Sequence, residues 1–435
     1  MTRMKDSGIE WIGEVPEEWG ITKFKYFLDT NKGLTITKEN LIEDGIPVIN
    51  YGQIHSKYGK SVSTDRDELP QVSANYLKFK QSLLKPGDFV FADTSEDIDG
   101  SGNFSTRIDD NGELFAGYHT IKAKLKNALE HDFRYFMHYF DSLAFRKQVQ
   151  NKVSGIKVYS ITQSILHETC LILPSLYEQS QIADFLDKKV AQLDKVKSLL
   201  EEQIKTLEDY RQSLIYETVT KGLDKTVPLK DSGVDWIGQI PEGWNVDRLG
   251  FHIYEINEKN IPQKSDFILS LTNKDGVIPY EDKGNQGNNS KDNLLDYKLA
   301  YPDTIVANSM NILIGSVGYS NYFGCISPVY YVFKERKGTN LRFVNYIMAT
   351  QLFQKELRKY ANGILEIRLR VSSEDILKRF CAFPSLSDQD KIVSYLDKRT
   401  NQINQMIAIK KEQIKNINKQ RQTLIYDYVT GKRRV

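Results

Sequence analysis

A tryptophan-rich segment occurs twice in this chain, and a second segment downstream of it is also repeated. Residues 5–19 read KDSGIEWIGEVPEEW and residues 230–244 read KDSGVDWIGQIPEGW, with ten of fifteen positions identical. Residues 174–221 return as residues 384–431, with matching pairs such as Arg211 and Arg421. A long period with two copies does not suit a solenoid, which needs at least three stacked units. The repeat instead indicates a duplicated molecule with a pseudo-twofold axis.

The segments enclosed by the repeats differ in length and sequence. Residues 20–173 and 245–383 each contain short apolar, β-prone runs that are broken by Gly, Asn, Asp and Pro. A helix is expected in each, at roughly 132–152 and 341–360. We therefore predict one mixed α/β fold that is used twice and carries two different surfaces.

Apolar residues recur every seven positions in both copies of the downstream repeat, except at Lys410 in the second copy, and are interleaved with further, mostly apolar positions. This spacing predicts two long coiled-coil helices, each of about 40 residues or ~60 Å, packed antiparallel. For either copy alone, an ordinary buried helix face is the alternative. Gly222 and Gly431 stand where a helix C-cap favours glycine. The expected seam residues are Leu186, Leu193, Leu200, Leu207, Leu214, Leu396, Ile403, Ile417 and Leu424.

Polar and apolar residues beside the seam leave two questions open. Arg211 and Arg421 fall on the seam, where a polar residue either fixes register or extends its aliphatic stem along the edge. A further apolar stripe widens each helix face, which implies a partner helix or cover by the globular segments. The stripe consists of Phe185, Val196, Leu199, Tyr395, Met406 and Ile409.

Charge and apolar content exclude several classes of protein. With 59 basic and 57 acidic side chains the net charge is +2, which argues against a protein that grips DNA alone by neutralising phosphates. No run approaches 18 apolar residues, and the first twenty residues contain acids and tryptophans where a signal peptide needs an apolar run. Three widely spaced cysteines suit a reducing compartment. We therefore expect a cytoplasmic protein without a membrane helix.

Motifs for catalysis are incomplete. Residues 52–61 end like a phosphate loop, but six residues separate Gly52 from Gly59 where the motif has four. His131 and His138 are better explained as core or rim residues than as metal ligands. Glu281 and Lys283 have the spacing of a nuclease E-x-K, a tripeptide that is common by chance. We therefore expect no catalytic residues, no metal and no cofactor in this chain.

Two loops carry hydrogen-bonding side chains among aromatic residues, at residues 50–60 and 283–291. Asn, Gln, Arg and Lys are the residues that pair with base edges in the major groove. Polar, glycine-rich loops are ordinary surface in most proteins, so these loops alone are weak evidence for nucleic-acid binding.

Together these segments resemble the DNA-specificity subunits of type I restriction-modification systems, over essentially the whole chain. The resemblance is carried by the boxes W-I-G-x-[VI]-P-E-x-W at residues 11–19 and 236–244, and by the strand-to-helix joins at residues 173–187 and 383–397. The turn at residues 85–88 also matches the family pattern, whereas its counterpart at residues 301–303 lacks the glycine.

The resemblance implies an α+β protein with two mixed α/β target recognition domains, separated by the two antiparallel helices. The expected bounds are 1–173 and 223–383 for the recognition domains, and 174–222 and 384–435 for the helices. Such a subunit reads a bipartite, asymmetric site in double-stranded DNA. It docks two modification (methyltransferase) subunits and, in the larger assembly, restriction subunits. S-adenosylmethionine and ATP are then expected on those partners.

Base contacts are expected from loops and strand ends at residues 50–60, 95–107 and 155–159, and at residues 283–291, 308–322 and 366–370. Two alternatives stay open: a two-headed coiled-coil scaffold that binds proteins, and a duplicated nuclease using Glu281 and Lys283. The candidate DNA-contacting residues are Gln53, Lys57, Tyr58, Lys60, Asn103, Arg107, Lys157, Lys283, Asn285, Gln286, Asn288, Asn308, Tyr319, Tyr322, Arg368 and Arg370.

Overall fold

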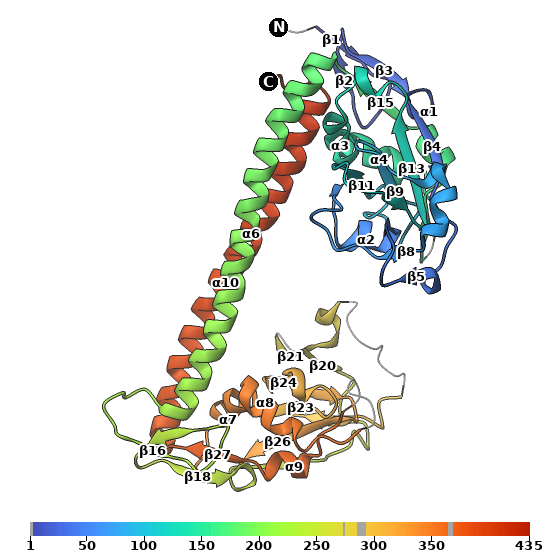
Figure 1. The fold of residues 1–435 in the computed structure, drawn as a ribbon. Coiled ribbons are helices and arrows are strands. Elements are labelled where there is room, and N and C mark those ends of the chain that lie inside the picture. Colours follow the sequence, from blue (N-terminus) through green and yellow to red (C-terminus); the bar gives the residue numbers. More distant parts are fainter. Residues whose placement is uncertain (1–2, 156, 273–274, 285–292, 364–368) are drawn as a thin grey trace. The chain divides into compact units, whose positions relative to one another are not determined.

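The computed structural model describes residues 3–155, 157–272, 275–284, 293–363 and 369–435. The chain divides into two compact units, of which the first combines distant parts of the sequence and the second is one continuous segment. Unit 1 consists of Met1–Leu200 and Glu412–Val435, and unit 2 of Glu201–Lys411. Figure 1 labels their elements. Among the described residues, no helix has the length and apolar character that a membrane span needs.

Unit 1 is built on a five-stranded sheet with the strand order β4-β13-β9-β11-β7. Its central strands pair antiparallel, and β7 joins the edge in parallel. A smaller sheet with the order β12-β6-β8-β5 lies in the same unit. The strands are β4 (Leu28–Lys32), β5 (Leu41–Ile42), β6 (Ile46–Ile49), β7 (Ser61–Val62), β8 (Gln71–Val72), β9 (Phe89–Ala92), β11 (Phe104–Arg107), β12 (Phe115–Ala116) and β13 (Thr120–Leu125).

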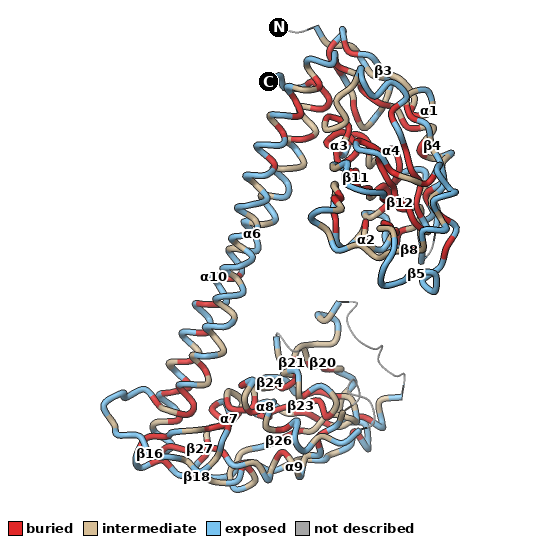
Figure 2. The backbone as a smooth tube through the Cα atoms, viewed as in Figure 1, coloured by how far each residue is buried: buried red, intermediate tan, exposed pale blue. Residues whose placement is uncertain are grey.

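Unit 1 contains two short helices, α3 (Phe133–Asp141) and α4 (Leu143–Gln150), most of whose residues are buried (Figure 2). Their aromatic side chains belong to the core of unit 1. We expected one helix over residues 132–152, and that prediction is wrong in detail. Ser142 has an extended backbone (φ −73°, ψ 155°) and is the N-cap of α4, so it ends one helix and begins the next. Two further short helices are α1 (Phe24–Phe27) and α5 (Gln163–His167).

Unit 2 repeats this plan with a four-stranded antiparallel sheet of order β19-β26-β23-β24. The expected helix at 341–360 is again two helices, α7 (Leu341–Met348) and α8 (Gln351–Arg358), with Thr350 as the N-cap of α8. Unit 2 contains β19 (Ile253–Ile256), β20 (Leu269–Thr272), β21 (Gly276–Pro279), β22 (Lys298–Ala300), β23 (Thr304–Asn308), β24 (Val317–Ser320), β25 (Gly324–Ile326), β26 (Tyr330–Glu335) and α9 (Ser373–Leu377).

The two tryptophan boxes form the same hairpin in both units. β1 (Met4–Asp6) pairs with β2 (Glu14–Pro16), and β16 (Leu229–Asp231) pairs with β17 (Gln239–Pro241) in the corresponding register. The chain then enters a second antiparallel pair, β3 (Gly20–Lys23) with β15 (Cys170–Leu173), or β18 (Asn245–Arg248) with β27 (Phe380–Phe383). This pair closes each domain just before its long helix begins.

The two long helices are α6 (Leu176–Lys221) and α10 (Leu386–Val429). Within unit 1, Leu186 packs in one core with Ile425, and Phe185 lies 4.5 Å from Tyr428 between ring centroids. Within unit 2, Leu396 shares a core with Ile215. The start of each helix therefore contacts the end of the other, and the predicted antiparallel packing is confirmed. Gly222 (φ +71°) and Gly431 (φ +72°) adopt the left-handed conformation that follows a helix end.

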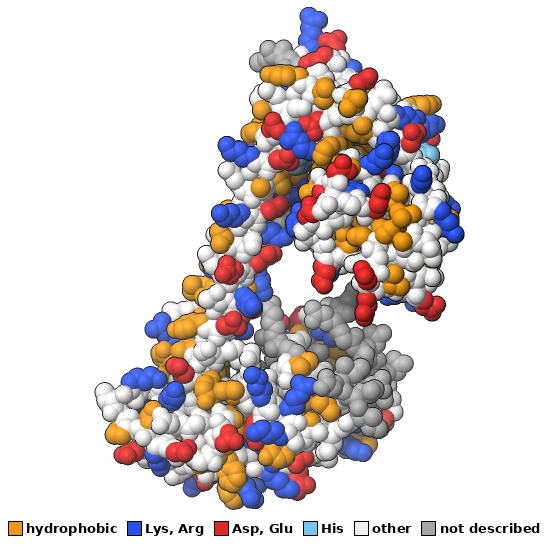
Figure 3. Space-filling view, viewed as in Figure 1, with side chains coloured by type: hydrophobic (Ala, Val, Ile, Leu, Met, Phe, Trp, Pro, Cys, Tyr) orange, Lys and Arg blue, Asp and Glu red, His pale blue; other side chains and the backbone are white. Residues whose placement is uncertain are grey.

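The seam and the additional stripe differ in burial. Leu186, Leu396 and Ile403 are buried, and the other expected seam residues are half-buried. In contrast, Val196 and Leu199 are 46% and 48% exposed, and Met406 and Ile409 are 48% and 60% exposed. The described globular segments therefore do not cover this part of the stripe. Figure 3 shows hydrophobic side chains among the charged ones on the helix surface.

Candidate functional site

Three segments from which base contacts are expected lie together in unit 1. The imidazole Nε2 of His55 donates to the carbonyl of Thr94 at 2.8 Å, and its Nδ1 accepts from the Asn103 amide at 2.9 Å. Strand β10 (Thr94–Ser95) pairs with β14 (Tyr159–Ser160). The segments 50–60, 95–107 and 157–159 thus form one continuous surface, which we call the unit 1 loop surface.

Helix α2 (Tyr51–Ser56) occupies part of the segment that we expected to be a loop, so that expectation is wrong. Asn50 and Gln53 form a capping box at its start, in which the Gln53 side chain accepts from the Asn50 backbone N–H at 2.9 Å. After the helix, Tyr58 is buried and its hydroxyl donates to the Glu68 carbonyl. Lys57 and Lys157 are exposed on the unit 1 loop surface.

Arg107 lies inside the domain, with 2% of its surface exposed. Its guanidinium donates to the carbonyl groups of Leu84, Asp109, Asn111 and Gly112 at 2.6–3.1 Å. Those contacts tie the end of β11 to the following loop. The donors of Arg107 are therefore engaged within unit 1.

Lys60 and Asp141 form a buried ion pair that reaches the C-terminal helix. The Lys60 ammonium contacts the Asp141 carboxylate, which also accepts from Arg421 of α10 at 3.0 Å. Arg421 lies 3.3 Å from Asp194 of α6. Burial by itself raises the pKa of the Asp141 carboxyl, but the positive charges of Lys60 and Arg421 outweigh it and hold that pKa below its usual value. We call these four residues the unit 1 ion cluster.

Arg146 and Asn103 connect the loop surface with helix α4. The Arg146 guanidinium donates to the Asn103 side-chain oxygen at 2.6 Å and to the Asp99 carbonyl at 2.6 Å. Asn103 in turn donates to His55, as described above. A chain of hydrogen bonds therefore fixes the loop surface on the helical layer of unit 1.

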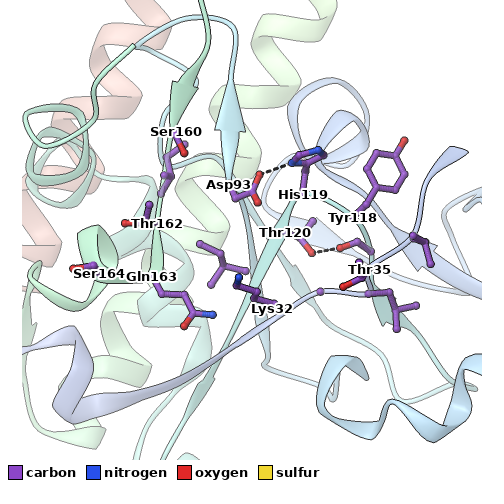
Figure 4. Close-up of a pocket in the computed structure, with 16 residues that line it drawn as sticks. Lys32, Thr35, Asp93, Tyr118, His119, Thr120, Ser160, Thr162, Gln163 and Ser164 are labelled. Atoms are coloured by element: carbon purple, nitrogen blue, oxygen red, sulfur yellow. Dashed lines mark hydrogen bonds and ion pairs between the residues drawn. The ribbon is translucent and has the colours of Figure 1, made fainter.

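A cavity of about 540 Å³ opens beside the loop surface (Figure 4). His119 stands in its wall with a left-handed backbone (φ +55°), and its Nδ1 lies 3.1 Å from Asp93. A non-glycine residue in this conformation is strained, and such strain concentrates at functional sites. Lys32 and Gln163 line the cavity as well. These residues could not be found from the sequence, because no motif links positions so far apart in the chain.

Segments 308–322 and 369–371 lie together in unit 2. The Val371 N–H donates to the Ser309 carbonyl at 3.1 Å, and the exposed Arg370 contacts the Met310 sulfur at 3.6 Å. Asn308 is buried and its side-chain oxygen accepts from the Met310 N–H at 3.0 Å. We call this the unit 2 loop surface.

The other candidates in unit 2 differ in their surroundings. Tyr322 is 37% exposed. The Lys283 ammonium lies 4.1 Å above the ring of Tyr280, in the 3-10 turn Tyr280–Lys283 that also contains Glu281. Four further candidates, Asn285, Gln286, Asn288 and Arg368, lie outside the described residues.

Tyr319 is expected to titrate unusually late. Burial raises its pKa to about 12, and its hydroxyl also donates to Asp303 at 2.5 Å. Because the folded pKa lies above the ordinary value of about 10, the stabilisation is complete below pH 10 and is lost as the pH rises through 12. The ionisation of Tyr319 is measured as the difference between the ultraviolet titration of the parent chain and that of the Tyr319→Phe variant. A difference step near pH 10 would contradict the described contact.

Comparisons with known proteins add to these observations. Residues 16–208 match the family described as type I restriction modification DNA specificity domain. The chain is 24% identical over 434 residues to the MjaX specificity subunit of Methanocaldococcus jannaschii, covering 98% of this chain and 96% of that one. It is 23% identical to the type I restriction enzyme MjaVIII specificity subunit of the same organism, covering 97% and 94%.

A solved structure has the same fold. A chain from a study of complex assembly and conformational transition in the type I R-M system matches with a TM-score of 0.64 at 16% identity, over 96% of this chain and 99% of that one. The family match and the full-length relatives agree with the repeated boxes and helices described above. Residues 16–208 of the chain therefore match a type I restriction modification DNA specificity domain, and the similarity to two specificity subunits extends over nearly the whole chain.

Proposed function

We propose that the chain reads a bipartite, asymmetric DNA site, with residues 1–173 recognising one half and residues 223–383 the other. The observation that carries this proposal is the contrast between the elements that recur in both units and the loop surfaces that differ. The hairpin, the strand pair and the long helix recur in both units, whereas the loop surfaces differ in sequence and contacts. A repeated frame with two unlike surfaces suits a reader of two unlike half-sites.

The exposed side chains of the loop surfaces are the proposed base and phosphate contacts. Lys57 and Lys157 in unit 1, and Tyr322 and Arg370 in unit 2, are accessible without rearrangement. Lysine and arginine bind phosphates and guanine, and an exposed aromatic ring packs against sugar or base. The contacts described above for Gln53, Asn103 and Lys60 hold this surface in place.

We further propose that the helices α6 and α10 hold the two recognition domains at a fixed spacing and dock two methyltransferase subunits, which restriction subunits join. The exposed apolar residues Val196 and Leu199 in unit 1, and Met406 and Ile409 in unit 2, support this, because exposed apolar surface marks interaction sites. In this proposal the chain has no catalytic role, and S-adenosylmethionine and ATP belong to the partners.

Exchange of one recognition domain tests the assignment of half-sites. We expect that replacing residues 20–173 with the corresponding segment of another family member changes one half of the methylated sequence and leaves the other half intact. Genome-wide mapping of methylated bases, in cells that express the chain with its methyltransferase subunit, measures the result. The matched control replaces residues 245–383 and should change the opposite half.

Either exchange could also give an outcome that contradicts the proposal. If both halves change together, the two domains do not read separate half-sites. If the complex assembles but no gapped methylated sequence exists, the chain is a two-headed scaffold, which the exposed apolar stripe would equally serve.

A further inference from the structure

Arg421 and Arg211 are equivalent positions in the two copies of the long helix, but their surroundings differ. In unit 1, Arg421 contacts two carboxylates, that of Asp141 at 3.0 Å and that of Asp194 at 3.3 Å. Asp141 is the last residue of α3, immediately before the N-cap of α4. The charge of Arg421 is thereby balanced inside the protein.

Both carboxylates are missing around Arg211 in unit 2. Asn404 takes the place of Asp194 and accepts from the Arg211 guanidinium at 2.5 Å. Ala349, which immediately precedes the N-cap of α8, takes the place of Asp141. No carboxylate among the described residues forms an ion pair with Arg211. A half-buried guanidinium without an anionic partner is costly, because it has lost water without gaining a counter-charge.

A cavity of about 470 Å³ occupies the space where unit 1 has its ion cluster. Arg211 and Gln212 of α6, Asn404 and Thr400 of α10, and Asn345 of α7 line it. Asn345 supplies the second observation, because its side-chain oxygen is buried and has no hydrogen-bond partner. A buried acceptor without a donor carries an energetic penalty that a ligand with a donor group would remove.

The charges around the cavity leave Arg211 as its available cation. Arg342 also lines the cavity, but it is paired with Asp397 at 3.1 Å, and the Tyr346 hydroxyl donates to the same carboxylate at 2.7 Å. Gln354 stands where unit 1 has Arg146. Asp275 is a lining carboxylate, and it is exposed.

We propose that this cavity is a binding site for a small organic acid, whose carboxylate pairs with Arg211 and whose hydroxyl or ammonium group donates to Asn345. The ligand carboxylate supplies, beside Arg211 in unit 2, the negative charge that Asp141 supplies beside Arg421 in unit 1. Guanidinium and carboxylate match in planar, bidentate geometry, which favours a carboxylate over a spherical anion. The cavity borders the unit 2 loop surface, since Gly315, Tyr319 and Asn321 also line it, and the binding of an organic acid there goes beyond the proposed reading of DNA.

Calorimetric titration of the full chain with L-malate tests this proposal. We expect the Arg211→Gln variant to weaken malate binding by roughly ten-fold or more, because a charge-assisted hydrogen bond is lost. Ala349→Asp should weaken it similarly while Arg211 stays in place, since the new carboxylate occupies the position of Asp141. Arg399→Gln removes the same charge from the exposed surface of α10 and should leave binding unchanged.

Three results would overturn the proposal. The first is no malate binding by the parent chain, and the second is an Ala349→Asp variant that is folded by circular dichroism and binds malate as tightly as the parent. The third is Arg211-dependent binding of inorganic phosphate without binding of malate, which would reject the carboxylate assignment. Ala349→Asp keeps the test decisive if Arg211→Gln does not fold.

Discussion

Replacing Asp141 with alanine is expected to destabilise unit 1 by about 3–5 kcal/mol. The Asp141 side chain is 11% exposed and holds Lys60 of the loop surface against Arg421 of α10. Its removal leaves two poorly solvated cations facing each other without the anion between them. Urea unfolding that is monitored by hydrogen exchange of residues 133–150 measures the loss of stability in unit 1.

Asp194→Ala is the matched control for this prediction. It removes a carboxylate from the same Arg421, but the Asp194 side chain is 53% exposed, so the expected loss is about 1 kcal/mol or less. Because the folded pKa of Asp141 is depressed, its stabilisation is complete above its ordinary pKa of about 4 and is lost as the pH falls further. Equal losses in the two variants would contradict the buried role of Asp141.

Phe140→Ala should destabilise the core of unit 1 by about 3–5 kcal/mol. Phe140 is 0% exposed, and its ring joins the sheet to the helices, with centroids 4.9 Å from Phe89, 5.3 Å from Phe91 and 4.7 Å from Phe145. The cavity left by the ring cannot collapse, because the strands on one side and α4 on the other are held by their own hydrogen bonds. The same unfolding measurement applies.

Leu129→Ala provides the control for loss of an apolar side chain. Leu129 is 98% exposed, so its truncation removes no buried contact and should change stability by less than about 0.5 kcal/mol. If Phe140→Ala were as mild as Leu129→Ala, the aromatic cluster would not be the core of unit 1.

The long helices and the duplicated frame could be predicted because their signals are local or repeated. Leucine at every seventh position encodes the seam directly, and Gly222 marks the helix end through its positive φ. The break at Ser142 and helix α2 were missed although signals exist. Ser142 has the residue type of an N-cap, and Asn50 with Gln53 has the spacing of a capping box.

The side-chain partners at the candidate sites could not be predicted in the same way. Lys60 and Arg107 have the residue type of a DNA contact, but their surroundings depend on which distant segments fold against them. Lys60 meets Asp141 at the end of α3, and the Arg107 guanidinium meets the Leu84 carbonyl, through tertiary packing that no local pattern encodes. His119 and Asp93 likewise become neighbours through strand pairing, which leaves no pattern in the sequence.

Unit 1 contains residues from both ends of the described chain, and this has a consequence for biosynthesis. Its core includes Ile425 and Val429, and the Tyr135 hydroxyl donates to the carbonyls of Ile172 and Val429 at 3.0 Å. Residues 412–435 leave the ribosome after all of unit 2, on the order of ten to forty seconds after residue 200 at ordinary rates of translation. The half that is synthesised first is therefore the half that is completed last. Until then, the apolar face of its helix must be shielded from other nascent chains.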